Sequence, residues 1–155
     1  MHESHMSRSH YRHLLVMTVI SFVAMYVLMY AMVNTFENVY MNVNQFYMAG
    51  LMTASMVIIE VVIMRAMYPD KRLNVGIIVA GFAVLAAFWI MIRQQTAVSD
   101  RQFLRSMIPH HASAILMCTK APIRDAEIKR LCENIVSGQQ AEIDQMTAKL
   151  KQLTR

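Results

Sequence analysis

The sequence has little of what several common classes of protein need. Two cysteines cannot form the disulfide framework of a small secreted domain. Three prolines and four glycines exclude a collagen-like or linker-dominated chain. Only 16% of the 155 residues are charged and 56% are hydrophobic, which excludes a disordered chain. The residue in excess is methionine, which occurs 16 times.

The charge balance is basic, with a formal net charge of +5. A basic chain can bind nucleic acid when its cations gather on a soluble face. Here the basic residues lie between long apolar runs, which is typical of membrane anchoring. We therefore expect the lipid bilayer as a partner and no nucleic acid.

Three apolar runs are long enough to cross a bilayer as helices: residues 14–33, 46–67 and 75–92. A helix of twenty residues reaches about 30 Å, the thickness of the hydrocarbon core. No small-residue cleavage site follows the first run, so we interpret it as a retained span. The sequence thus predicts a cytoplasmic basic arm at 1–13 and a three-helix membrane domain at 14–93.

Basic residues flank these spans unevenly: Arg8 and Arg12 precede the first, and Arg65, Lys71 and Arg72 lie between the second and third. The connection at 34–45 has none. Because cytoplasmic loops carry the excess of Lys and Arg, the N-terminus is expected in the cytoplasm and the tail outside it. We expect a multi-pass membrane protein with its C-terminal domain outside the cytoplasm.

The tail, residues 99–155, has the pattern of a helical hairpin. Ser99 and Gln102 form a capping-box pattern at the start of the first helix. Pro109 should kink this helix, and Ala121-Pro122 should end it. Asp125 is placed to cap a second amphipathic helix.

A single hairpin has little core of its own, so we expect self-association into a four-helix bundle, as a dimer or a higher homo-oligomer. The fold class predicted is all-α. A stripe of small residues in the third span would serve packing within the three-helix unit or between subunits: Gly76, Ala80, Ala83 and Ala87.

The sharpest chemical pattern is the string Met107-Ile108-Pro109-His110-His111. Three- and four-residue steps allow Met107, His110 and His111 to converge from one turn of helix. Imidazole and thioether form a soft, neutral ligand set that suits Cu(I) or Ag(I). Met117 and Cys118 follow two turns on. The alternative is an exposed histidine pair with Met107 filling the core.

Hairpin geometry predicts which residues face one another. With Pro122 as the centre of the turn, Cys118 and Cys132 are offset along the axis by about 9 Å, which disfavours a disulfide between them. Met146 then falls opposite residue 98, far from His110. It would join the histidines only through another subunit, or form a separate site near the membrane.

These motifs resemble the bacterial domain of unknown function 305, in its membrane-anchored branch. The resemblance rests on the Met-Ile-Pro-His-His string and the helical frame of residues 100–150, with Phe46–Ala49 and Lys71–Asn74 in the membrane part. It implies ferritin-like helical bundles and copper or silver binding for metal tolerance, with these ligands: Met107, His110, His111, Met117 and Met146. One departure is Leu116, where family members commonly have an acidic residue.

Two further patterns have open interpretations. The N-terminal arm carries His2, His5, Met6, His10 and His13, which would either chelate a metal or lie as a basic arm near anionic lipid. In the second span, Met48, Met52, Met56, Glu60 and Met64 recur at four-residue steps. They would form a thioether ladder for soft cations with Glu60 as a relay, or pack flexibly with Glu60 protonated or bonded to a neighbouring helix.

The function expected is membrane-anchored, periplasmic binding of Cu(I) or Ag(I) for tolerance or homeostasis. No catalysis is expected, because the tail lacks the Glu-x-x-His pairs of di-iron oxidases. The alternative is a structural or regulatory membrane module whose tail self-associates or docks a partner without metal.

Overall fold

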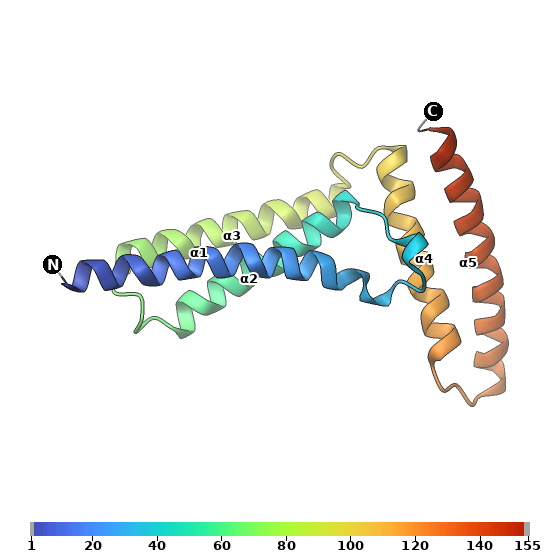
Figure 1. Cartoon of the computed structure of the whole chain (residues 1–155), viewed down its shortest axis with the longest axis horizontal. Coiled ribbons are helices and arrows are strands. Elements are labelled where there is room, and N and C mark those ends of the chain that lie inside the picture. The colour runs from blue at the N-terminus through green and yellow to red at the C-terminus, as the bar shows by residue number, and fades with distance from the viewer. Residues whose placement is uncertain (1, 154–155) are drawn as a thin grey trace. The chain divides into compact units, whose positions relative to one another are not determined.

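A computed structural model describes the backbone of residues 2–153 and the side chains of residues 9–153 (Figure 1). Its helices are α1 (His2–Leu28), α2 (Val43–Ile63), α3 (Lys71–Gln94), α4 (Asp100–Lys120) and α5 (Ala126–Gln152). Two short 3-10 turns, η1 (Met29–Met32) and η2 (Phe36–Asn38), lie between α1 and α2. The described residues contain no strand, which confirms the all-α prediction.

Three segments are long and apolar enough to cross a membrane: Ser9–Met32, Val43–Ile63 and Lys71–Gln94. The three predicted apolar helices are therefore present, with shifted ends. α3 begins at Lys71, before the apolar run predicted from residue 75, because the carboxylate of Asp70 accepts hydrogen bonds from the backbone N–H groups of Arg72 and Leu73. α2 ends at Ile63, earlier than the predicted 67.

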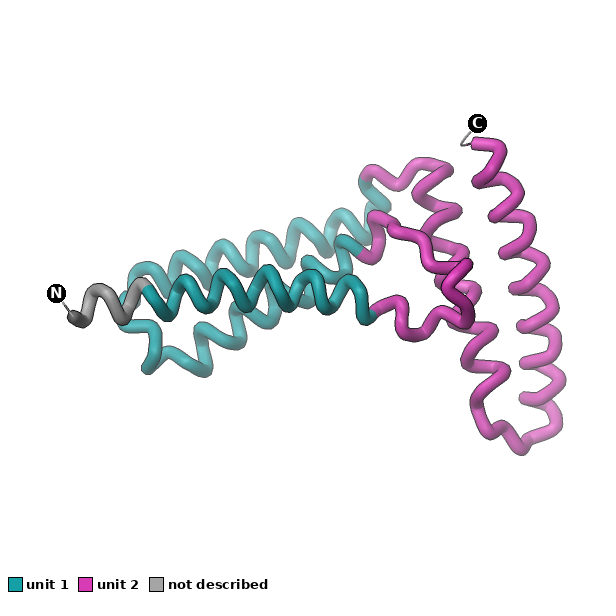
Figure 2. Tube along the Cα trace, viewed as in Figure 1, with its two compact units in different colours: residues 1–28, 46–96 teal, residues 29–45, 97–155 magenta. Residues whose placement is uncertain are grey.

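The chain forms two compact units (Figure 2). Unit 1 consists of residues 1–28 and 46–96, and unit 2 of residues 29–45 and 97–155. Residues 29–45, predicted to belong to a membrane domain at 14–93, are thus part of the same unit as the hairpin. The reason is packing: Val33 and Tyr40 lie against the apolar core between α4 and α5.

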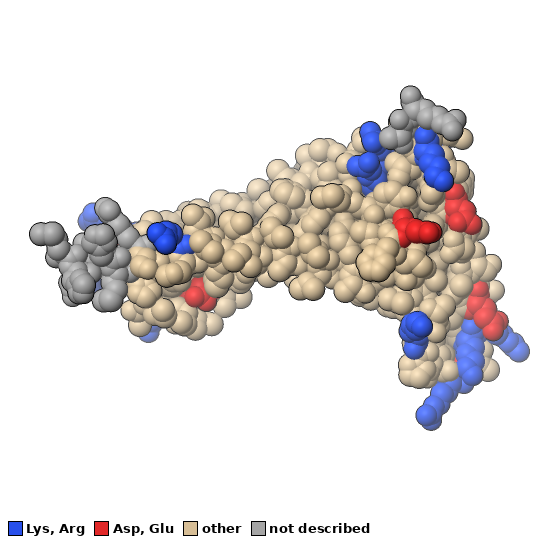
Figure 3. Space-filling view, in the orientation of Figure 1, with Lys and Arg blue, Asp and Glu red and all other residues tan. Residues whose placement is uncertain are grey.

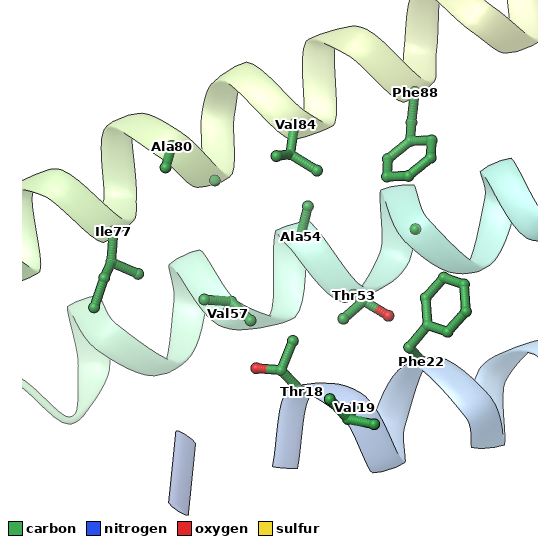
Figure 4. A pocket seen from close by; sticks show the side chains of 12 residues that line it. Thr18, Val19, Phe22, Thr53, Ala54, Val57, Ile77, Ala80, Val84 and Phe88 are labelled. Atoms are coloured by element: carbon green, nitrogen blue, oxygen red, sulfur yellow. The ribbon is translucent and has the colours of Figure 1, made fainter. Parts of the chain in front are cut away.

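In unit 1, α2 is the most covered helix. Its buried residues are Tyr47, Ala49, Gly50, Thr53, Ala54, Ile58 and Val61, whereas no residue of α3 is buried. Two glycines permit the close approach of α2 and α3. A Cβ added to Gly50 would meet the ring of Phe88, and one added to Gly81 would lie 2.7 Å from Ile58. An apolar cavity of about 480 Å³ lies between α1, α2 and α3 (Figure 4).

The predicted stripe of small residues does not make these contacts. A Cβ on Gly76 would have nothing within 4 Å, and Ala80, Ala83 and Ala87 are exposed. Gly76, Ala83 and Ala87 therefore do not serve packing within the three-helix unit, whereas Ala80 lines the cavity between α1, α2 and α3. Gly50 and Gly81 fill that role, because they lie on the faces that α2 and α3 turn toward each other.

In unit 2, α4 and α5 form the predicted hairpin, and two of its boundaries follow from identified residues. α4 ends at Lys120 because Ala121, before Pro122, has an extended backbone. The carboxylate of Asp125 accepts the N–H groups of Glu127 and Ile128 at 2.9 and 3.0 Å, which caps α5 as predicted.

The start of α4 is as predicted, but its capping mechanism is not. Ser99 occupies the N-cap position and its side chain makes no capping hydrogen bond. The Gln102 side chain instead accepts the backbone N–H of Val43 at 3.2 Å, so it bridges α4 to the first residue of α2. The prediction of a capping box is wrong, because the side-chain oxygen of Gln102 is engaged in this long-range hydrogen bond.

The core of unit 2 consists of Ile108, Ala112, Ile115, Ile143 and Leu150. Residues 29–45 cover part of it, so some of the burial that was expected from a second copy comes from the same chain. Apolar side chains that remain exposed on the hairpin include Phe103, Met117, Ile128 and Leu131.

The hairpin is closed by a disulfide between Cys118 and Cys132, whose Cα atoms are 5.2 Å apart. The prediction that this bond is disfavoured is wrong. Residues 121–125 form a non-helical connection between the helices, and the midpoint of the cysteine pair is Asp125 and not Pro122. The residues of α5 that face α4 are therefore shifted toward the C-terminus.

Substituting the two N-cap residues tests these boundaries. Asp125→Ala should lower the free energy of unfolding of the hairpin by about 1 kcal/mol, because two N–H groups lose their acceptor. Ser99→Ala is the matched control and should change it far less, since no capping bond is lost. Thermal unfolding of the full chain in detergent measures both, and equal losses would contradict the assignment.

Candidate functional site

His111 is the centre of the polar contacts between α4 and α5. Its side chain is 10% exposed, and its Nδ1 lies 2.8 Å from the carbonyl oxygen of Met107. Its Nε2 lies 2.7 Å from Oε2 of Glu142 on α5. Because a carbonyl can only accept, Nδ1 carries the proton, and Nε2 is the nitrogen that faces the partner helix.

The contact with Glu142 restricts the protonation state of the pair. A neutral ring has a single N–H, which the Met107 carbonyl uses. The short contact at Nε2 therefore needs one more proton, on the ring or on the carboxylate. A cation that binds Nε2 must displace that proton and move Glu142, whose side chain is 57% exposed and free to turn outward.

The same contact fixes which residues of the hairpin lie at one level. The two helices are antiparallel. A residue four positions earlier on α4 and a residue four positions later on α5 are therefore displaced in the same direction along the hairpin axis, each by about 6 Å. From His111 and Glu142 this step leads to Met107 and Met146. Each methionine also lies on the same face as its starting residue, since i and i+4 are neighbours on a helix.

Met146 therefore lies at the level of Met107 along the hairpin axis. The prediction that it faces residue 98 is wrong because the midpoint of the hairpin is near Asp125 and not at Pro122. Met146 is half-buried and packs against the core of unit 2. Met107 is also half-buried. Of the predicted ligands, Met107 thus lies one turn from His111 on α4, and Met146 lies one turn from Glu142 on α5.

The other predicted ligands lie differently. His110 is exposed, with its ring centroid 5.9 Å from that of His111. Met117 is 52% exposed. Cys118 is bonded to Cys132, which leaves it no thiolate to bind a metal in this oxidised form.

Sequence reasoning missed Glu142 as a partner of His111. The signal was available, because Glu142 lies in the helical frame of the second tail helix, but the turn centre was misplaced. Among the described residues, no group of three or more His, Cys, Asp or Glu side chains could hold a metal ion. A site in this part of the chain would therefore have to use thioether sulfur.

Glu60, the candidate intramembrane relay, lies in the last turn of α2. The Tyr68 hydroxyl, in the following turn of the chain, donates to its Oε1 at 3.4 Å. Burial raises the pKa of Tyr68, and the nearby Glu60 carboxylate raises it further, so Tyr68 stays a neutral donor. This arrangement provides Glu60 with a structural partner in the loop, where a bond to a neighbouring helix was the expected alternative.

The methionines before Glu60 do not share one environment. Met48 and Met52 are 39% and 42% exposed, while Met56 is half-buried. The first two thus lie on the outside of unit 1. In the N-terminal arm, His13 is exposed and His10 is half-buried, and the side chains of His2, His5 and Met6 lie outside the described residues.

Comparison with known proteins gives one family and one relative. A family model described as domain of unknown function (DUF305) matches residues 90–150. The uncharacterized protein L153 of Acanthamoeba polyphaga mimivirus is 31% identical over 138 residues, which cover 87% of this chain and 89% of the relative. No solved structure matches.

Alkylation tests the disulfide that fixes the hairpin. Protein produced with its tail in an oxidising compartment should gain no iodoacetamide adduct when denatured without reductant, and two adducts after reduction, by intact mass. The variant Cys118→Ser is the control, and should gain one adduct without reductant. Two adducts on the unreduced wild type would show that the bond does not form.

Proposed function

The chain belongs to the family of the domain of unknown function 305, and on that basis we propose that it is a membrane-anchored binding protein for a soft monovalent metal ion. The ion is Cu(I) or Ag(I), and its site lies between α4 and α5. Three ligands form it: Met107, His111 and Met146. Binding sequesters the ion or passes it on, as part of metal tolerance or homeostasis, and includes no catalytic step.

The observation that carries this proposal is the contact between His111 and Glu142 at 2.7 Å. It supports a site in which one imidazole and two thioethers, each about one helical turn away, would come together in a partly buried setting. Polarisable monovalent ions prefer such ligands, whereas Zn²⁺ is usually bound by thiolate, imidazole or carboxylate. The bond from Nδ1 to the Met107 carbonyl orients the ring and leaves Nε2 for the ion.

Glu142 gives the site a dependence on protons. The ion competes with a proton for the His111–Glu142 pair, so affinity falls as the pH is lowered. The freed carboxylate stays close to the positive ion and offsets its charge. Glu142 is thus a counter-ion in the bound state and the partner of the protonated pair in the free state.

Location on the outer side of a membrane has two independent supports. The basic residues Arg65, Lys71 and Arg72 flank the second and third spans on the side of the N-terminus, which by the positive-inside rule is the cytoplasmic side. The tail also holds a disulfide, and such bonds persist in oxidising compartments. We place the tail in the periplasm of a bacterial inner membrane.

Self-association would complete the site. His110 and Met117 are exposed, so a second copy of the chain can supply them to a neighbouring site or bury them in a helical bundle. The homo-oligomer is a dimer or a higher state.

A second candidate function is a docking module whose tail binds a protein partner without metal. It is favoured by exposed apolar side chains near the closed end of the hairpin, where Met117, Ile128 and Leu131 are each about half exposed or more. This candidate predicts that removing ligand sulfurs has no effect on metal binding.

Competition titration of the full chain in detergent tests the proposal. Cu(I) and Ag(I) are each titrated against a chromogenic chelator. Met107→Leu/Met146→Leu keeps side-chain volume and removes both thioethers, and should weaken binding by about 100-fold, or about 2.7 kcal/mol. The matched control Met32→Leu/Met41→Leu removes two exposed thioethers of the same unit and should leave affinity unchanged.

Histidine variants separate the two candidates further. His111→Ala should weaken binding in the same way, and Glu142→Gln should reduce the dependence of affinity on pH. Equal affinities for wild type, His111→Ala and the double methionine variant would remove the metal site and leave the docking module.

A further inference from the structure

The turn between α2 and α3 holds a second pocket, far from the hairpin in sequence. Its volume is about 490 Å³, and its lining residues are Arg65, Tyr68, Pro69, Lys71, Asn74 and Val75. Both helices that it joins are long and apolar enough to cross a membrane, and only residues 64–70 separate them. A turn this short between two spans must lie at the depth of the lipid headgroups.

Hydrogen bonds of Asn74 connect the α2–α3 turn, α3 and α1 around this pocket. The Asn74 side chain donates to the Tyr68 carbonyl at 2.8 Å and accepts from the Tyr11 hydroxyl of α1 at 2.7 Å. The rings of Tyr11 and Tyr68 lie 5.3 Å apart. The pocket is therefore preformed by three segments of unit 1.

The pocket carries positive charge, and no acidic side chain among its lining residues neutralises that charge. Arg65 and Lys71 are both exposed, and neither forms an ion pair with any residue that the structure describes. Two acids that the structure describes at this end of unit 1 are already engaged. Asp70 accepts two backbone N–H groups, and Glu60 accepts the Tyr68 hydroxyl.

The surface around the pocket is apolar along the helices. Val75 and Val79 of α3 are 61% and 64% exposed, and they lie one turn apart on the same face. Figure 3 shows the same distribution for unit 1, where charged atoms gather near the end that carries the N-terminus and the helical length beyond them is tan. A ligand here meets cations at one end and hydrocarbon-like surface along its length.

We propose that this pocket binds an anionic phospholipid, with its phosphate between Arg65 and Lys71 and an acyl chain along Val75 and Val79. Basic pockets between spans at the membrane surface match phosphate headgroups in charge and depth. A free phosphate ion would use the cations but not the apolar face. This inference does not depend on the proposed metal site.

Native mass spectrometry of the full chain in neutral detergent tests it, with equal amounts of phosphatidylglycerol and phosphatidylcholine. Wild-type protein should retain one phosphatidylglycerol in preference. Arg65→Gln/Lys71→Gln should reduce that preference by about 30-fold. Two exposed cations at the hairpin turn provide the matched control, Arg124→Gln/Lys129→Gln, which should keep it.

Three results would overturn the proposal. They are no preference in the wild type, the same loss in the control variant, and full displacement of the lipid by inorganic phosphate. The variant Arg65→Lys/Lys71→Arg preserves charge and should retain the lipid. This variant distinguishes loss of the cationic site from an effect of altering the two side chains. Far-UV circular dichroism of the double glutamine variant checks that its helices are still formed.

Discussion

The tail depends on how α4 and α5 are aligned along their common axis. Three constraints set that alignment: the non-helical connection at 121–125, which ends where Asp125 caps α5, the Cys118–Cys132 bond and the His111–Glu142 contact. All three agree, since each cross-helix pair has its midpoint at or close to Asp125. A shift by one helical turn, about 5.4 Å, would move Met146 away from the level of Met107 and separate His111 from Glu142. Packing of the core and the chemistry of the site thus rest on one alignment.

Unit 1 and unit 2 differ in how their helices pack and in how their apolar side chains are covered. In unit 1, glycine allows α2 and α3 to approach closely, and the exposed surface is apolar, as lipid requires. Its charged residues lie near the ends of the three apolar helices, where Arg65 and Lys71 remain without counter-ions among the described residues. In unit 2, residues 29–45 cover a hairpin core that would otherwise be exposed, through Val33 and Tyr40.

Local patterns in the sequence predicted the helices well. Apolar runs gave the three candidate spans, Ala121-Pro122 gave the end of α4, and Asp125 gave the start of α5, because each depends on a few neighbouring residues. Long-range contacts could not be predicted in this way. The turn centre was misplaced because residues 121–125 are not helical, so the cysteine pair and Met146 were assigned to wrong levels and Glu142 was not identified as the partner of His111. The bond from Val43 to Gln102 spans 59 residues and leaves no local signal.

Cysteine cross-linking tests the alignment most directly. In the background Cys118→Ser/Cys132→Ser, the substitutions Met107→Cys and Met146→Cys should form a disulfide on mild oxidation of the full chain in detergent. A second pair, Val98→Cys with Met146→Cys, represents the alignment centred on Pro122 and should not form one. The account predicts a linked product for the first pair only, seen as a change in mass after alkylation. Linkage of the second pair, with none of the first, would contradict it.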